Sequence, residues 1–232
     1  MDEDNNKIIV ALDFSNAGDA LRLVDQLLPS ECRLKVGNEL FTRAGPSFVS
    51  RLVSRGYSVF LDLKFHDIPN TVSRAVCSAA ELGVWMTNVH ASGGVRMMTL
   101  AKQKLIEQGS DMLLIGVTVL TSMDSAELAE TGVCSNIEHQ VLHLAKQAKE
   151  SGLDGVVCSA KEAPLLRVEM GTNFTLVTPG IRLPGDNKDD QCRVMEPKRA
   201  IEMGSNYLVI GRAITKAEAP LKALRKINQS LA

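Results

Sequence analysis

Two acids, a lysine and a histidine are among the first six residues of the stretch DLKFHDIPNT, residues 62–71. Residues 59–61 just before it are apolar, so these charges stand where a buried strand would end. Side chains alternate between the two faces of a strand, which puts Asp62 and Lys64 together on one face. An unpaired charge inside a protein is costly, so these two side chains must pair with each other or with a third group.

Two further charged residues follow apolar runs earlier in the chain. Asp13 ends the run 8–12, and Lys35 lies within RLKVG, residues 33–37. If the strands are neighbours, they form an alternating charged row of Asp13, Lys35, Asp62 and Lys64, with Asp67 a few residues beyond. The alternative interpretation is a buried ion-pair network that only fixes the register of the strands.

The chemistry of such a row follows from its alternation of sign. A lysine between carboxylates stays protonated, because nearby negative charge favours the ammonium form. It is then a poor Schiff-base nucleophile, but a good proton donor and a good counter-charge for a developing carbanion. The excess of acids would also disfavour a substrate carboxylate in the ground state.

Other polar residues at strand ends are open to two interpretations. His66 and His90 could touch a substrate, or could be packed and hydrogen-bonded histidines of the core. Thr121 and Ser159 also follow apolar runs. No set of His, Cys and Asp residues has metal-ligand spacing, so the sequence predicts no metal site.

The elements that must position these side chains are short apolar segments alternating with segments of helical period. Near-continuous hydrophobicity is typical of parallel strands covered on both faces. Strict alternation predicts a single-domain (β/α)8 barrel over residues 1–232, with an open doubly wound sheet as the alternative. The stretch DFSNAGD after the first strand argues against that alternative, because a dinucleotide fold has G-x-G-x-x-G there. The expected strands are 8–14, 33–37, 57–65, 85–91, 112–120, 155–160, 174–180 and 207–213, and the expected helices are 17–28, 46–55, 70–82, 94–108, 136–150, 161–168, 196–203 and 217–228.

A phosphate site is expected across the barrel mouth from the charged row. Barrels often bind phosphate with the loops after strands seven and eight. The loop 179–193, PGIRLPGDNKDDQCR, supplies Arg182 and Gln191 and is long enough to act as a lid. In IGRAI, residues 210–214, Gly211 allows close approach of the backbone and Arg212 offers a bidentate fork. The alternative is a turn glycine followed by a surface arginine.

Composition narrows the class of protein. The 232 residues carry 26 basic and 27 acidic side chains, and a net charge of −1 without a basic tract does not support nucleic-acid binding. No apolar stretch has the length of a membrane span, and the first residues, MDEDNNK, are the reverse of a signal peptide. The five cysteines are scattered and odd in number, which is typical of reduced thiols in the cytoplasm.

The stretch DLKFHDIPNT resembles the signature of the orotidine 5′-phosphate decarboxylase family. Further similarity lies in ALDF (11–14), LKVG (34–37), VTVLTS (117–122), TPGIR (178–182) and IGRAI (210–214), so it covers essentially the whole chain. The resemblance implies a dimeric (β/α)8 barrel that converts orotidine 5′-monophosphate to UMP and CO2, in pyrimidine biosynthesis, without cofactor or metal.

The resemblance also implies a role for each matching residue. Lys64 would protonate C6 of the pyrimidine, beside Asp62 and the departing carboxylate. Lys35 would bridge Asp62 and the ribose hydroxyls, and Asp13 would bind ribose. Asp67 and Thr71 would enter the neighbouring subunit's site across the dimer interface. Thr121 would lie in the substrate pocket, and the phosphate would be held by Arg182, Gln191, Gly211 and Arg212.

Three other functions remain open from the sequence. The first is a sugar-phosphate decarboxylase or aldolase that shares the D-x-K-x-x-D pattern and uses Mg²⁺. The second is an aldolase with Lys64 as a Schiff base, which the flanking acids disfavour. The third is a non-catalytic nucleotide-phosphate binder, which would gain nothing from buried like charges.

Overall fold

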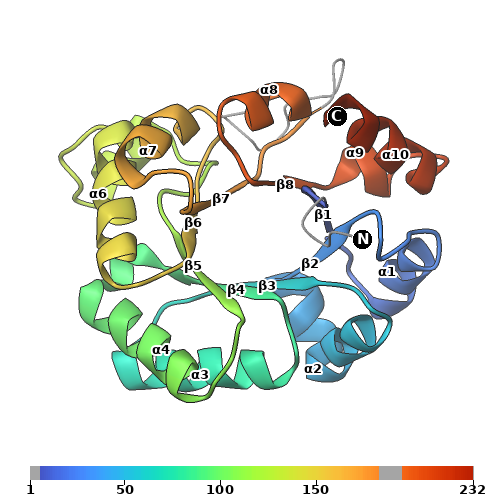
Figure 1. Ribbon diagram of the computed structural model, residues 1–232, viewed down its shortest axis with the longest axis horizontal. Helices are drawn as coiled ribbons and strands as arrows, with labels where there is room; N and C mark the ends of the chain where they lie inside the picture. The colour runs from blue at the N-terminus through green and yellow to red at the C-terminus, as the bar shows by residue number, and fades with distance from the viewer. Residues whose placement is uncertain (1–5, 183–194, 232) are drawn as a thin grey trace.

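The computed structural model describes residues 6–182 and 195–231, and in it eight parallel strands close into a barrel with helices around the outside (Figure 1). Each strand pairs with the next along the chain, and β1 pairs with β8, so the sheet has no free edge. The predicted (β/α)8 barrel is confirmed, and the open-sheet alternative is wrong. The strands are β1 (Ile8–Ala11), β2 (Arg33–Gly37), β3 (Val59–Phe65), β4 (Met86–His90), β5 (Leu113–Val117), β6 (Gly155–Val157), β7 (Thr175–Thr178) and β8 (Tyr207–Ile210).

The helices lie close to their expected positions, with three differences. The second helix begins at Asn38 and contains a break at Gly45, whose φ of 68° suits a residue without Cβ; Pro46 then starts the part that was expected. The short helices α5 and α9 were not among the expected helices, because they are shorter than a period can reveal. The helices are α1 (Ala17–Val24), α2 (Asn38–Ser54), α3 (Pro69–Glu81), α4 (Val95–Glu107), α5 (Ser125–Glu130), α6 (Ile137–Glu150), α7 (Ala163–Met170), α8 (Pro197–Glu202), α9 (Arg212–Thr215) and α10 (Pro220–Leu231), with a 3-10 turn at Ala91–Gly93.

The alternation of strand side chains produces two apolar cores. In β1, Ile8 and Val10 belong to the large core between the strands and the helices. Ile9 and Ala11 belong to a small core inside the barrel. Because this inner layer is filled by side chains, the barrel is packed and not a pore. The inner layer consists of Ile9, Ala11, Phe60, Met86, Ile115, Val177 and Val209.

The N-terminal end of the barrel is closed by a stacked cation. The Arg33 guanidinium lies 4.0 Å from the centroid of the Trp85 ring and 5.2 Å from that of Tyr207, and the two rings meet edge to face. These residues begin or precede β2, β4 and β8. A polar functional site is therefore expected at the opposite end of the barrel, where the strands end. None of the helices described is long and apolar enough to cross a membrane.

Candidate active site

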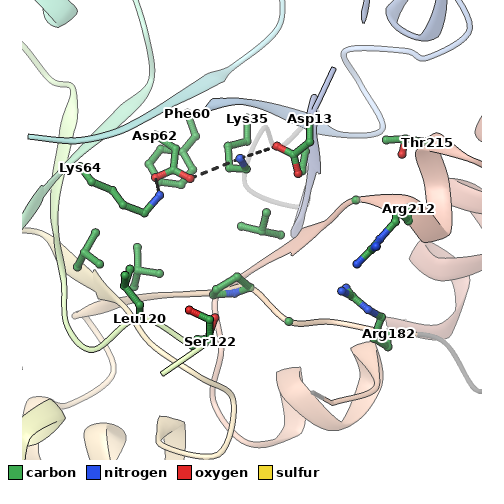
Figure 2. A pocket seen from close by; sticks show the side chains of 18 of the residues that line it. Asp13, Lys35, Phe60, Asp62, Lys64, Leu120, Ser122, Arg182, Arg212 and Thr215 are labelled. Carbon is green, nitrogen blue, oxygen red and sulfur yellow. Dashed lines mark hydrogen bonds and ion pairs between the residues drawn. The ribbon is translucent and has the colours of Figure 1, made fainter. Parts of the chain in front are cut away.

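A cavity of about 680 Å³ opens at the C-terminal ends of the strands (Figure 2). Its floor is the apolar inner layer of the barrel, represented by Phe60 and Val209. Figure 2 shows the charged row on one wall and Arg182 and Arg212 on another, with both guanidinium groups directed into the space between them. The cavity therefore offers one wall of alternating charge and a separate cationic wall.

The charged row forms a continuous chain of ion pairs. Lys35 Nζ lies 3.1 Å from Asp13 Oδ1 and 3.4 Å from Asp62 Oδ2. Lys64 Nζ lies 2.7 Å from Asp62 Oδ1. The structure thus brings together, in the order expected, the four residues that the sequence singled out.

Burial and pairing act in opposite directions on the two most buried members of the row. Burial would raise the pKa of Asp62, but Lys35 and Lys64 outweigh it and hold that pKa below its usual value. Burial would likewise lower the pKa of Lys35, but Asp62 and Asp13 outweigh it and raise that pKa. Both side chains are therefore charged at neutral pH.

Lys64 owes its direction to an irregularity of β3. Leu61 pairs with Thr87 of β4, but the next paired residues are Phe65 and Val89, so the register shifts between them. Lys64 lies inside this bulge with a φ of 51°, and its side chain bends back toward Asp62 in Figure 2. The bulge therefore places the ammonium group at the cavity wall.

The cationic wall comes from the seventh and eighth strand loops. Arg182 follows β7 and is half-buried, and its Nη1 donates to the carbonyl of Ile181 at 3.0 Å. Gly211 and Arg212 follow β8, where α9 begins, and both line the cavity. Gln191 and most of the expected lid, 179–193, lie outside the residues that the structure describes.

A model described as the orotidine 5′-phosphate decarboxylase / HUMPS family matches residues 6–227 of the chain. The chain belongs to this family. It is 59% identical over 229 residues to the orotidine 5′-phosphate decarboxylase of Vibrio parahaemolyticus, with 98% of each chain covered. It is 57% identical to that of Pseudoalteromonas translucida, with 99% of this chain and 98% of the relative covered. Among solved structures, the enzyme from Lactobacillus acidophilus has a TM-score of 0.88 at 41% identity, covering 97% of this chain and 99% of that one.

Several residues that the family signature or the strand ends suggested lie away from the cavity. Asp67 and Thr71 are exposed and are not part of its wall, and Asp67 accepts a hydrogen bond from its neighbour Ile68 N at 2.6 Å. Ser159 is fully buried, and its N–H donates to Glu162. The rings of His66 and His90 lie 5.5 Å apart, outside the lining of the cavity.

Thr121 lines the cavity as expected, but the sequence analysis did not single out several residues that lie near it or near Lys35. Leu120 and Ser122 flank Thr121 on the loop after β5, and both reach the cavity. Gly37 was also missed: a Cβ there would stand 3.1 Å from Lys35 Nζ, so the glycine leaves room for the ammonium group. The signal that could have found Leu120 and Ser122 is their position in the loop that immediately follows a buried strand.

The described residues contain no cluster of three or more His, Cys, Asp or Glu side chains arranged to hold a metal ion. Asp62 and Asp13, the carboxylates nearest the cavity, are instead paired with lysine.

His90 is expected to make folding stability depend on pH. Burial, together with the adjacent His66 and Lys64, holds the pKa of His90 below its usual 6.5. Below that value the unfolded chain binds a proton that the folded chain resists, so stability is present above about pH 6.5 and is lost as the pH falls. Urea unfolding at pH 7.5 and 5.5 should show a smaller loss for His90→Gln than for the wild type. His139→Gln, on the exposed face of α6, is the control, and an equal pH dependence in all three proteins would contradict the prediction.

Proposed function

We propose that the protein decarboxylates orotidine 5′-monophosphate to UMP and CO2, with Lys64 as the proton donor. The observation that carries the proposal is the pairing, in one cavity, of the charged row with the wall of Arg182 and Arg212. A nucleotide monophosphate fits such a cavity if its phosphate lies at the arginines and its base at Lys64. The family name and the relatives that bear it supply the substrate.

In the proposed reaction the bond from C6 to the carboxylate breaks, and its electron pair stays on C6. The carboxylate leaves as CO2, and an N–H proton of the Lys64 ammonium moves to C6, which leaves a neutral amine that solvent reprotonates. Asp62, held ionised by two lysines, lies beside the substrate carboxylate and disfavours it relative to neutral CO2. Lys64 supplies positive charge where the carbanion develops.

The rest of the nucleotide is assigned to the residues around this centre. Lys35 and Asp13 bind the ribose hydroxyls, and Thr121 contacts the substrate from the β5 loop. The phosphate is held by Arg182, Gln191, Gly211 and Arg212, and the loop 179–193 closes over it. Phosphate binding far from C6 then provides energy for closure and offsets the repulsion at Asp62.

We infer a homodimer in which the partner's Asp67 and the partner's Thr71 complete each site. Within one chain, Asp67 and Thr71 are exposed and lie outside the lining of the cavity, which leaves them accessible to a second subunit. Ile68 between them is 66% exposed, a large apolar side chain that a subunit interface would cover. A cytoplasmic location is part of the same proposal, because the described residues Cys32, Cys77 and Cys134 form no disulfide.

The test of the function is a direct assay with orotidine 5′-monophosphate in the presence of EDTA. The pyrimidine absorbance should fall at the same rate with and without the chelator, because no step of the proposed reaction uses a metal. A metal-dependent sugar-phosphate enzyme of the same family would be inhibited by EDTA and restored by Mg²⁺. Absence of any absorbance change with orotidine 5′-monophosphate would contradict the proposal, and trapping of a lysine adduct by borohydride would favour an aldolase instead.

A further inference from the structure

Asn88 lies in the middle of β4, is fully buried, and connects two residues of the charged row. Its Nδ2 donates to Asp62 Oδ1 at 2.8 Å. Its Oδ1 accepts from the backbone N–H of Lys64, also at 2.8 Å. The Asn88 side-chain amide therefore contacts both the carboxylate of Asp62 and the backbone of Lys64, the proposed proton donor. It does not line the cavity.

The position of Asn88 opposite the bulge explains why this amide is needed. From the pair Leu61–Thr87 to the pair Phe65–Val89, β3 advances four residues while β4 advances two. The Lys64 N–H consequently has no carbonyl of the regular ladder opposite it, and the Asn88 side chain supplies the acceptor. Lys64 is also the one non-glycine residue with a positive φ in the described part of the chain, a conformation that persists only where its surroundings impose it.

The same amide restricts the Asp62 carboxylate. Oδ1 accepts from both Lys64 Nζ and Asn88 Nδ2, while Oδ2 faces Lys35 at 3.4 Å. Both carboxylate oxygens thus face donors, which come from β2, β3 and β4. Together these donors restrict the rotation of the Asp62 carboxylate. Because the amide is neutral, it adds a donor to the carboxylate without adding charge to the row.

We propose that Asn88 is a positioning residue, which holds the Asp62 carboxylate and the bulged Lys64 backbone in the geometry that proton transfer to the substrate requires. The inference rests on the proposed function and assigns it a residue that touches no substrate. An asparagine suits the role because one side chain must donate to a carboxylate and accept from an amide at the same time. Alanine removes both bonds, whereas aspartate keeps the volume and the acceptor but replaces the donor with a like charge.

The first experiment compares Asn88→Ala with Thr87→Val. Thr87 is also fully buried, on the same strand, and its Oγ1 donates to the Leu61 carbonyl of β3 at 2.9 Å, but it contacts neither Asp62 nor Lys64. Asn88→Ala should lower kcat by roughly 10²-fold, the order expected from misplacing a catalytic group by about 1 Å. KM and the affinity for UMP should change by less than about threefold, since the arginine wall is intact. Thr87→Val should keep kcat within about threefold of the wild type.

A second variant separates positioning from general loss of structure. Asn88→Asp retains the side-chain size. The kcat of this variant divided by the kcat of the wild type should rise as the pH falls, because the protonated carboxyl can again donate to Asp62. The charged and titratable groups around it are Asp62 and Lys64 on β3, Lys35 on β2, His90 on β4 and His66 after β3; they are common to both proteins, so the ratio removes their own titration. A ratio independent of pH would overturn the donor role.

The outcomes distinguish this inference from the function it rests on. Wild-type kcat in Asn88→Ala, or equal losses in Asn88→Ala and Thr87→Val, overturns the role of Asn88 while the function stands. A wild-type protein that does not consume orotidine 5′-monophosphate overturns both. A loss confined to kcat in Asn88→Ala, with pH-dependent recovery in Asn88→Asp, supports the inference.

Discussion

Replacing Lys64 with alanine is expected to lower kcat by about 10³-fold or more. In the proposed reaction the variant loses the proton donor, whose contribution in positioned general acids is typically about 10²–10⁴-fold, and it also loses positive charge at the developing carbanion. It further leaves Asp62 Oδ1 without its 2.7 Å partner at the cavity wall. The measurement is the absorbance assay under saturating substrate, with UMP binding followed separately by calorimetry.

Lys161→Ala is the matched control for this variant. Lys161 is an exposed lysine in the loop after β6, so its removal changes the net charge by the same amount without touching the charged row. We expect kcat of this control to stay within about twofold of the wild type, in line with the small effects of exposed substitutions. Normal turnover by Lys64→Ala, with UMP binding intact, would refute the assignment of the proton donor.

The Arg212→Ala variant is expected to lose about 10²–10⁴-fold in kcat/KM, although Arg212 touches no reacting atom. Two charge-assisted bonds from a guanidinium to phosphate contribute about 1.5–3 kcal/mol each, which corresponds to that range of rate. The loss should appear in both kcat and KM, because in the proposed reaction part of the phosphate binding energy would be used to close the site over the substrate.

The specificity of this effect can be tested with a substrate that lacks the phosphate. On orotidine, Arg212→Ala and the wild type should have the same low kcat/KM, since this substrate has no phosphate for the Arg212 guanidinium to bind. Arg199→Ala, at an exposed arginine of α8 that pairs with Glu202, controls for the loss of a surface charge. An equal loss on the nucleotide and on the nucleoside would mean that Arg212 acts through the structure and not through the phosphate.

The barrel could be predicted because its signals are local. Apolar runs of strand length alternate with helical segments throughout, and strand alternation predicted a shared face for Asp62 and Lys64. Both line the cavity, although the bulge in β3 sets the direction of Lys64. The fold class then predicted that β1 pairs with β2 and β2 with β3. This pairing sets the order of the charged row. Each of these steps needs only spacing along the chain.

The parts that could not be predicted depend on contacts between distant strands. Nothing in the order of residues indicates that β3 bulges at Lys64 or that Asn88 meets it, because both follow from the pairing of β3 with β4. The helix expected over 46–55 misses the first part of α2, which begins at Asn38 and breaks at Gly45. The residue types of Leu120 and Ser122 do not indicate a site, and only their place in the loop after a buried strand could have pointed to the cavity.

The Arg33 stack at the N-terminal end of the barrel bears on how the products leave. Arg33, Trp85 and Tyr207 occupy that end, and Phe60 and Met86 belong to the apolar layer inside the barrel, so we expect the products to leave through the mouth at the C-terminal ends of the strands. CO2 and UMP would therefore leave by the same route. The rate at which CO2 escapes would then depend on how far the mouth of the cavity is covered while UMP is still bound. In the proposed reaction, trapped CO2 would recombine with the carbanion in competition with its protonation, and we expect rapid proton transfer to C6 to make turnover irreversible.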